Sequence, residues 1–333
     1  MLKLPPLVRA LLEPKTYPHA PQQVELVQTQ MSFIFLTGDY VYKVKKPVDL
    51  GYLNYTTLEK RRFFCYQELK LNRRLSPDIY LEVVPIVQYQ DKILLGDEGE
   101  VIEYAVKMRQ LPSQSMMDVL LPQNQVSTPM VRRVAQKLAD FHQKAESNTE
   151  ISSYGSLKAI LTNTEENFVQ TQKYIGVSVS QEQYQSIKAY TDAFAEQNVP
   201  LFEKRMREGR IRDCHGDLHS AHVCFIDSIC IYDCIEFNDR FRYCDVASEI
   251  AFLAMDLDYH GHPDLSKHFI DAYVESSQDE ELLQLLNFYK GYRAYVRGKV
   301  ESFKLDDTLI PEKEKTKALS AAKRYFQLAE GYI

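Results

Sequence analysis

The densest group of chemically active side chains in this 333-residue sequence lies at 215–222, which reads HGDLHSAH. Its three histidines and one aspartate stand between two strand-like stretches, 211–214 and 223–226. Titratable residues crowded between strands are typical of a functional site. Gly216 permits a tight backbone, so the Asp217 carboxylate can orient a substrate hydroxyl or accept its proton. A structural loop with a helix-capping aspartate is the alternative, but it explains one carboxylate and not this ordered set.

A second carboxylate follows at the end of another apolar run. Residues 229–234 are read as a strand, and Ile235-Glu236-Phe237 comes directly after them. An acidic residue at the end of an apolar strand can hold Mg²⁺ on the phosphates of a nucleotide. Glu236 is therefore a candidate metal ligand.

Lys43 is the candidate for a phosphate-binding cation. It lies in a strand-like run at 40–45, where alternation places Val41, Lys43 and Lys45 on one face. A lysine on an otherwise apolar strand can hold nucleotide phosphates. The alternative is an exposed edge strand with solvated lysines.

Glu68 is the predicted partner of Lys43. It lies in a helix expected at 56–75, on the same face as the apolar Phe64, Leu71 and Leu75. Burying a carboxylate alone is costly, so a partner of opposite charge is expected. A strand lysine held by a helix glutamate is how kinases direct a lysine to nucleotide phosphates. The alternative places Glu68 at the rim of the face, in water.

The elements that must position these residues change in character near Pro112. Before it, strands are expected at 24–27, 32–36, 40–45, 81–87, 92–95 and 101–108, around the helix at 56–75. The runs 32–36 and 40–45 read as a hairpin, because a Thr-Gly-Asp turn joins them. The first part is thus expected to be an antiparallel sheet with one long helix.

The second part is expected to be mainly helical. Apolar spacing predicts helices at 130–148, 156–175, 182–209, 246–259, 263–276, 280–303 and 311–331. A compact strand–loop–strand region, 211–237, lies between them. The fold class is therefore α+β, with a sheet-rich lobe followed by a helical lobe.

Composition excludes several functions. The formal net charge of −6 and the absence of a long basic run argue against nucleic acid as a partner. No apolar stretch is long enough to span a bilayer, and the first residues do not resemble a signal peptide. The six cysteines form no Cys-x-x-Cys pair, so reduced thiols in a cytoplasmic protein are expected, with no membrane association. The oligomeric state is not predicted.

These residues resemble those of the aminoglycoside phosphotransferase-like kinases, whose relatives include choline, homoserine and fructosamine kinases. The resemblance covers nearly the whole chain and looks closest to a large, poorly characterised bacterial branch. In some members of that branch the domain is fused to a P-loop kinase domain; this sequence has no Gly-x4-Gly-Lys-Ser/Thr motif, so the stand-alone form is expected. The matching residues are 42–44, Glu68, 138–142, 215–219, 235–237, Asp245 and Glu249.

The resemblance implies a two-lobed, protein-kinase-like fold. Residues 1–107 would form the nucleotide-binding lobe, 108–113 a hinge, and 114–333 a helical lobe with the catalytic segment 211–245 and the acceptor-binding helices. Such a protein would transfer the γ-phosphate of ATP to a hydroxyl of a small molecule, with Mg²⁺ or Mn²⁺ as the cofactor ion.

The resemblance also implies a role for each matching residue. Asp217 would be the catalytic base, braced by His215 and Asp245 and supported by His219. Lys43, held by Glu68, would contact the phosphates. The remaining nucleotide-binding residues would be Val41, Ser32, Met108 and Leu111, with 108–111 beside the adenine.

Two departures from the family pattern concern the metal. The family has Asn seven residues after the first histidine of the loop, where this sequence has His222. The second metal-ligand position is usually Asp, and Glu236 is assigned to it here. A third departure is milder, because residues 29–32 form the loop before Lys43 without a Gly-x-Gly-x-x-Gly motif. His222 and Glu236 are thus expected as the metal ligands.

Two rival functions stay open. A zinc metallohydrolase would use His215, Asp217, His219 and His222, which have His-x3-His and His-x2-His spacing. It leaves the lysine–glutamate pair unexplained. A pseudokinase, which binds nucleotide without transferring phosphate, would account for the two metal-site departures.

The acceptor is predicted from a basic stripe near the C-terminus. Lys290, Arg293 and Arg297 share one face of the helix expected at 280–303. A basic stripe suits an acceptor with a carboxylate or phosphate better than a polycation. The alternative is an ordinary solvated helix face.

Overall fold

The computed structural model describes residues 4–308 and 310–333 of the chain. The chain divides into two compact units. The first comprises Met1–Met116 and His222–Asp239, and the second Met117–Ala221 and Arg240–Ile333.

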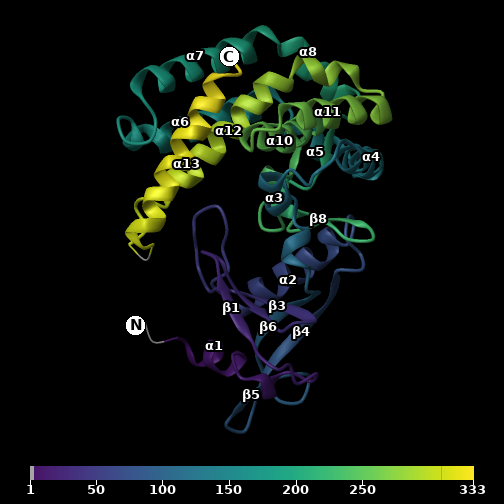
Figure 1. Ribbon diagram of the computed structural model, residues 1–333, viewed down its shortest axis with the longest axis vertical. Helices are drawn as coiled ribbons and strands as arrows, with labels where there is room; N and C mark the ends of the chain where they lie inside the picture. The colour runs from purple at the N-terminus through teal and green to yellow at the C-terminus, as the bar shows by residue number, and fades with distance from the viewer. Residues whose placement is uncertain (1–3, 309) are drawn as a thin grey trace. The chain divides into compact units, whose positions relative to one another are not determined.

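The first unit is built on a six-stranded antiparallel sheet with strand order β1-β2-β3-β6-β4-β5 (Figure 1). Gly38 turns β2 into β3 with a φ of 92°, a left-handed conformation that favours glycine. The predicted strands at 32–36, 40–45 and 92–95 have the predicted bounds, and the ends of the others move by one or two residues. The strands are β1 (Glu25–Gln28), β2 (Ser32–Leu36), β3 (Tyr40–Lys45), β4 (Tyr80–Tyr89), β5 (Lys92–Leu95) and β6 (Glu100–Arg109).

The sheet carries one apolar core on each face. Helix α2 (Leu58–Asn72) packs against β4 and β6, and the core on its side includes Val41, Cys65 and Val106. The other core includes the alternate β3 residues Tyr42 and Val44, together with residues of α1 (Pro6–Leu11), a short helix that the sequence did not predict. Strand alternation therefore turns Val41, Lys43 and Lys45 toward α2, as predicted.

The helix predicted at 56–75 is shorter at both ends. The Thr57 side chain accepts a hydrogen bond from the backbone N–H of Lys60 and caps the first turn. The helical pattern stops at Asn72, before the turn that leads to Pro77.

The segment His222–Asp239 belongs to the first unit, although the sequence placed it in the second lobe. It forms a hairpin of β8 (Val223–Phe225) and β9 (Ile229–Ile231). Cys224 and Cys230 of this hairpin lie in the same core as Val41 and Met108. This shared apolar core explains the placement.

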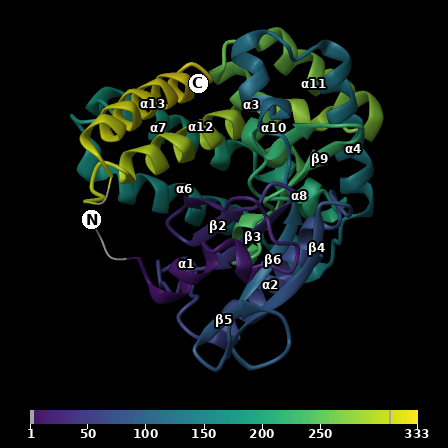
Figure 2. The ribbon, with the colours of Figure 1, turned by 60° about the horizontal axis from the view of Figure 1, so that its bottom comes forward.

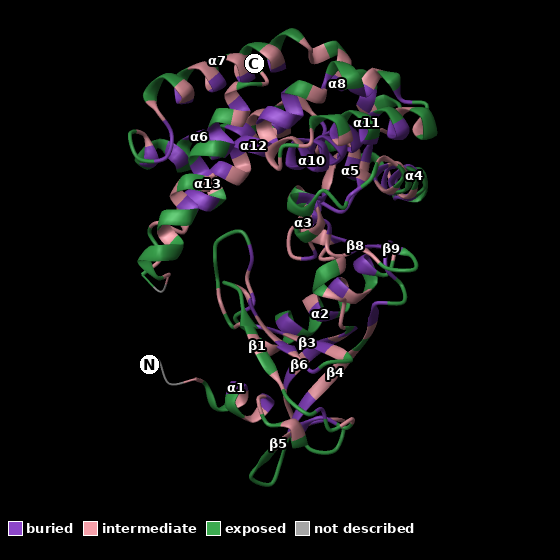
Figure 3. Cartoon of the chain, viewed as in Figure 1, coloured by how far each residue is buried: buried purple, intermediate pink, exposed green. Residues whose placement is uncertain are grey.

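The second unit is mainly helical (Figure 2), and α10 is almost entirely buried in it (Figure 3). Its largest core cluster includes Phe168, Phe252, Tyr295 and Phe326. Two short strands, β7 (Ile211–Asp213) and β10 (Tyr243–Asp245), pair antiparallel within it. The helices are α3 (Met117–Leu120), α4 (Thr128–Lys144), α5 (Thr149–Ser153), α6 (Leu157–Thr171), α7 (Gln181–Gln197), α8 (Val199–Arg207), α9 (Asp239–Arg242, which begins at the last residue of the first unit), α10 (Val246–Tyr259), α11 (Pro263–Ser277), α12 (Leu286–Phe303) and α13 (Glu312–Glu330).

The predicted helices of the second part are mostly present. The helix predicted at 246–259 has the predicted bounds. The helix predicted at 182–209 is two helices. The first, α7, ends at Gln197, and Pro200 stands in the first turn of α8, where its missing N–H is tolerated. Within the described residues, no helix has both the length and the apolarity that crossing a membrane requires. The six cysteines are free thiols.

Candidate active site

Two lysines of β3 share the carboxylate of Glu68 in the first unit. The Nζ of Lys43 lies 2.8 Å from Glu68 Oε1, and the Nζ of Lys45 lies 2.6 Å from Oε2. The side chain of Glu68 is fully buried. The predicted Lys43–Glu68 pair is therefore present, and the alternative of a rim position in water is wrong.

The electrostatics of this cluster keep its groups charged. Burial opposes the charge of Lys43, but Asp233, Glu68 and Glu236 raise its pKa well above the usual value. Burial likewise opposes the charge of Lys45, whose pKa is raised by Glu236 and Glu68. For Glu68, burial favours protonation, but the two lysines hold its pKa below the usual value.

Glu236 is the second partner of Lys45. It forms a buried ion pair with the Lys45 ammonium and accepts a hydrogen bond of 2.6 Å from the Tyr55 hydroxyl. Its side chain is 6% exposed. The Glu236 carboxylate is thus used within the protein, and these contacts do not favour it as a metal ligand.

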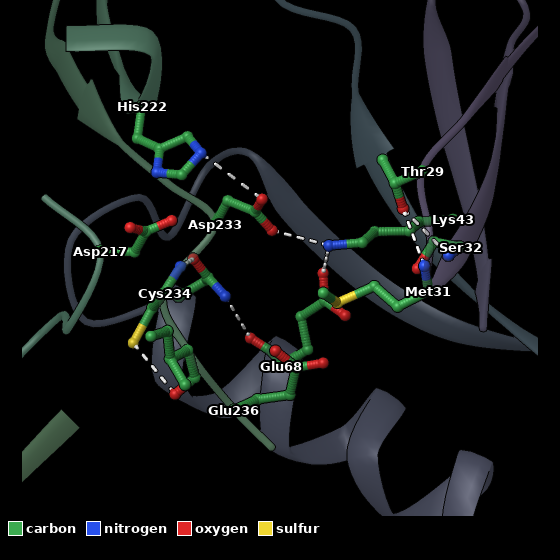
Figure 4. A network of polar contacts seen from close by, with 12 residues as sticks. Thr29, Met31, Ser32, Lys43, Glu68, Asp217, His222, Asp233, Cys234 and Glu236 are labelled. Carbon is green, nitrogen blue, oxygen red and sulfur yellow. Dashed lines mark hydrogen bonds and ion pairs between the residues drawn. The ribbon is translucent and has the colours of Figure 1, made fainter. Parts of the chain in front are cut away.

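Asp233 is a site residue that the sequence reasoning missed. It lies two residues after the end of β9. Its φ of 63° is a left-handed conformation that is uncommon outside glycine. Its Oδ1 lies 2.6 Å from Lys43 Nζ, and its Oδ2 lies 3.6 Å from His222 Nε2 (Figure 4). The sequence offered one signal, an acidic residue inside the apolar run 229–234, which was predicted instead to be an unbroken strand.

Hydrogen bonds to main-chain groups hold the Asp233 segment in place. The backbone N–H of Asp233 donates to the Tyr80 hydroxyl at 3.1 Å, and that of Cys234 donates to Asn72 Oδ1 at 2.8 Å. The Ser76 hydroxyl both donates to and accepts from the backbone of Ile231. The direction of the Asp233 side chain is therefore set by its surroundings.

The donor atoms of Asp233 and His222 fit a divalent cation. The side chain of Asp233 is 40% exposed and that of His222 is 14% exposed, so solvent reaches both. A carboxylate oxygen beside an imidazole nitrogen is a donor pair that Mn²⁺ accepts readily, and Mg²⁺ accepts the oxygen. Asp233 with His222 thus fits the implied ion better than Glu236.

The predicted nucleotide-binding residues lie around one apolar core of the first unit. Val41, Met108 and Leu111 belong to the cluster that also contains Tyr232 of the 222–239 segment. The Ser32 hydroxyl lies at the start of β2, buried and without a hydrogen-bond partner among the described residues. The Thr29 hydroxyl closes the loop before it by accepting from the Ser32 N–H at 3.0 Å.

In the second unit, Glu249 of α10 holds the loop that contains Asp217. Its carboxylate accepts hydrogen bonds from the N–H groups of His215 and Gly216, at 2.8 and 2.7 Å. It also lies 2.8 Å from Nε2 of His142. Burial would raise the pKa of Glu249, but His142, His215 and these hydrogen bonds lower it to about 2. The loop backbone is thus fixed by a buried, ionised carboxylate.

Asp217 stands at the exposed end of this fixed loop. Its side chain is 35% exposed, whereas His215 is fully buried. The backbone N–H of Asp217 donates to His215 Nδ1 at 3.3 Å, and its carboxylate lies 3.6 Å from His219 Nε2. His215 and His219 thus contact the residue that they were predicted to support.

Asp245 contacts the helix and the strand that lie next to the loop. It caps α10 through the backbone N–H of Ala247 and forms a buried ion pair with Arg205, at 2.6 Å. It also pairs in register with Ile211, at the strand that leads into the loop. The direct contacts to the loop backbone come instead from Glu249.

The three basic residues predicted to form a stripe on α12 have different partners. Lys290 is buried and lies 2.9 Å from Asp258. Arg293 is also buried and donates to the carbonyl oxygens of Ser248 and Gly216, at 3.2 and 3.3 Å. These two residues are not a solvated face. Among the described residues, Arg297 forms no hydrogen bond to a main-chain carbonyl, and its Nε has no partner.

The histidines predicted for a zinc site have different surroundings. The His215 ring is buried and receives a backbone N–H, while His222 belongs to the first unit. His142, Cys214 and Glu249 also bring potential ligand atoms within 4.8 Å of one another. However, Glu249 and His142 already use their polar atoms on the loop and on Tyr273. These contacts do not favour a metal ion at His142, Cys214 and Glu249.

Comparisons with known proteins agree with the resemblance. No protein-family model matches the chain. Uncharacterized proteins of Mycobacterium tuberculosis and Mycobacterium bovis are 32% identical to it over 279 residues, which is 84% of this chain and 54% of theirs. The chain therefore spans about half the length of these curated relatives.

Solved structures of small-molecule kinases share the fold. A choline/ethanolamine kinase family protein from Mesorhizobium loti has a TM-score of 0.55 at 10% identity, covering 97% of this chain and 99% of that one. Aminoglycoside 2'-phosphotransferase-IIIa, in its GDP complex, has a TM-score of 0.55 at 14% identity, covering 96% and 98%. An amicoumacin kinase with bound AMP-PNP and Ca²⁺ has a TM-score of 0.52 at 11% identity, covering 96% and 92%. The chain thus has the protein-kinase-like fold of the aminoglycoside phosphotransferase-like kinases, as its sequence predicted.

Proposed function

We propose that this protein is an ATP-dependent phosphotransferase that transfers the γ-phosphate to a hydroxyl group of a small molecule in the cytoplasm. The observation that carries the proposal is the network of Lys43, Glu68 and Asp233. A lysine held by a buried glutamate, with an aspartate that can bind a cation beside it, suits the binding of nucleotide phosphates. The neighbours in complex with GDP or AMP-PNP support nucleotide as the ligand.

Each residue of the network has a role in this proposal. Lys43 contacts the phosphates, and Glu68 keeps its ammonium group charged and directed. Val41, Met108 and Leu111 surround the adenine, and Ser32 lies at the loop over the phosphates. Asp233 and His222 hold the divalent cation, which neutralises charge on the phosphates when it is bound.

Asp217 is the proposed catalytic base. Its carboxylate accepts the proton of the acceptor hydroxyl as the acceptor oxygen forms its bond to the γ-phosphorus. The bond between the γ-phosphorus and the bridging oxygen breaks, and ADP leaves. The loop fixed by Glu249 presents the carboxylate in one position, which lowers the cost of orientation.

The test is acceptor-dependent ADP release by the purified protein with MgATP or MnATP, over a library of hydroxyl-containing metabolites. We expect a small number of acceptors to stimulate ADP release, each with a phosphorylated product of matching mass. Nucleotide binding without transfer to any acceptor would support the pseudokinase instead. Stoichiometric zinc in the purified protein would favour the metallohydrolase.

A further inference from the structure

Arg297 lies in α12 one helical turn beyond a residue that contacts the catalytic loop. Arg293 donates to the carbonyl oxygen of Gly216, and its guanidinium lies 4.8 Å from the ring centroid of Phe252. Residues four apart on a helix share a face, about 5–6 Å apart. Arg297 therefore lies on the same face of α12 as Arg293, which contacts the loop at Gly216. Asp217 is the next residue of that loop.

Two aspartates, Asp217 and Asp256, stabilise the positive charge of Arg297. Burial would lower its pKa, but Tyr325, Asp217 and Asp256 raise it above the usual value. Asp256 itself is buried and accepts hydrogen bonds from the backbone and hydroxyl of Ser220 in the loop. The guanidinium is thus close enough to both carboxylates for their negative charges to stabilise it.

Arg297 differs in its partners from three other arginines with little exposure, and resembles Arg293, whose printed hydrogen bonds go to main-chain carbonyl oxygens. Arg205, Arg242 and Arg61 each form an ion pair with a carboxylate, at 2.6 to 2.7 Å. The Nε of Arg297 is buried and has no hydrogen-bond partner in the part of the chain that the structure describes. The side chain as a whole is half-buried and also hydrogen-bonds to the neutral Tyr325. Burying part of a guanidinium without an anionic partner is costly, so an anion from outside the chain would stabilise it.

An aromatic stack fixes the ring next to Arg297. The rings of Tyr259 and Tyr325 are parallel within 9°, with centroids 3.8 Å apart. The Arg297 guanidinium lies 5.6 Å from the Tyr325 ring, and that of Arg324 lies 4.3 Å from the Tyr259 ring on α10. The packing restrains the Arg297 side chain, so it loses little freedom on binding a ligand.

Building on the proposed kinase function, we propose that Arg297 is the specificity-determining residue for the acceptor and binds an anionic group, a carboxylate or a phosphate, on the molecule whose hydroxyl Asp217 orients. Asp217 and Asp256 would repel an anionic acceptor that met no positive charge. Arg297 offsets this repulsion and gives a planar, bidentate partner for either anion. Lys290 and Arg293, which are engaged inside the unit, are not required as ligands.

The test compares wild type, Arg297→Met and Arg324→Met with matched hydroxy compounds: glycerol, glycerate and glycerol phosphate, then glucose, gluconate and glucose 6-phosphate, and the polycation kanamycin. Binding is measured by calorimetry without nucleotide, and transfer by ADP release. We expect the wild type to prefer one anionic member of a set, which tells carboxylate from phosphate. Arg297→Met should weaken its binding and raise its KM roughly 10- to 100-fold. The KM for ATP should not change, and Arg297→Lys should recover part of the loss.

Arg324→Met is the matched control, because Arg324 is an exposed arginine on the same aromatic stack. It should leave anion binding unchanged. Preference for a neutral or cationic compound, no anion binding at all, or equal losses in both variants would overturn the proposal. Anion binding that depends on Arg297, without transfer by the wild type, would refute the kinase function and leave the anion subsite standing.

Discussion

The two carboxylate oxygens of Glu68 each form an ion pair with a different lysine, Lys43 or Lys45. These lysines differ in solvent exposure, and we infer different roles for them from that difference. The side chain of Lys43 is 12% exposed and can reach a ligand, whereas that of Lys45 is 1% exposed. Strand alternation predicted that both lysines share a face. It could not predict that Lys45 is enclosed, because Glu236 and Tyr55 come from distant parts of the sequence.

Alanine substitutions of the two lysines should therefore have different effects. Lys43→Ala should weaken ATP binding while the protein stays folded. Lys45→Ala should lower the free energy of unfolding by about 3–5 kcal/mol, because Glu68 and Glu236 would share a buried site with one fewer cation. Urea unfolding and calorimetry with ATP separate the two effects.

A double variant provides the control for that experiment. Adding Glu236→Gln to Lys45→Ala should recover part of the lost stability, since it removes one of the unpaired charges. A folded Lys45→Ala protein that has lost ATP binding, next to a normal Lys43→Ala protein, would show that the two roles are exchanged.

The proposed metal site depends on the backbone conformation of one residue, Asp233. Asp233 reaches its place through a left-handed φ that breaks the apolar run after β9. In the sequence, the only signal of this break is that an acidic residue stands within an apolar run. Asp233→Asn should abolish most metal-dependent nucleotide turnover, whereas Glu236→Gln should act mainly on stability. If Glu236→Gln alone removed the metal requirement, the assignment to Asp233 would be incorrect.

His222 should influence which ion is preferred. Imidazole suits Mn²⁺ better than Mg²⁺, so His222→Asn should shift the ratio of initial rates toward Mg²⁺. The rates of wild type and variant are compared at saturating concentrations of each ion. An unchanged ratio would mean that His222 is not a ligand.

At the scale of elements, the strands were predicted more closely than the helices. The alternation in β2 and β3 and the turn at Gly38 are local signals, and they determined the bounds. The break between α7 and α8 depends on Asn198 and Pro200, which lie within one continuous apolar pattern. The short helices α1, α3 and α5 were not predicted, because each has too few residues to show a helical period.

The contact of α10 with the loop predicts a pH dependence of stability. The folded-state pKa of Glu249 is about 2, below the ordinary pKa of 4.5 for a glutamate. Its contribution is thus present above pH 4.5 and is lost as the pH falls toward 2. This contribution of Glu249 to the free energy of unfolding is on the order of 3 kcal/mol. Between pH 5 and pH 3, the unfolding free energy of Glu249→Gln should fall less steeply than that of the wild type; parallel curves would contradict this role.

At the scale of the whole molecule, the order of elements predicted an α+β fold, and the resemblance to the kinases implied its protein-kinase-like form. A sheet-rich first part, a strand–loop–strand motif and a helical second part correspond to structures that share only 10–14% identity with the chain. The sequence did not predict that 222–239 packs with the first unit. That placement depends on Cys224 and Cys230 sharing a core with Val41, a contact between residues far apart in the chain.

The central claim is that Asp217 promotes phosphoryl transfer to a hydroxyl. The most direct test is the initial rate of product formation from ATP and an acceptor found by ADP release, compared between wild type and Asp217→Asn. We predict that the variant loses on the order of a hundredfold or more in rate, with unchanged ATP affinity and unfolding temperature. Equal rates of transfer by the two proteins would contradict the account.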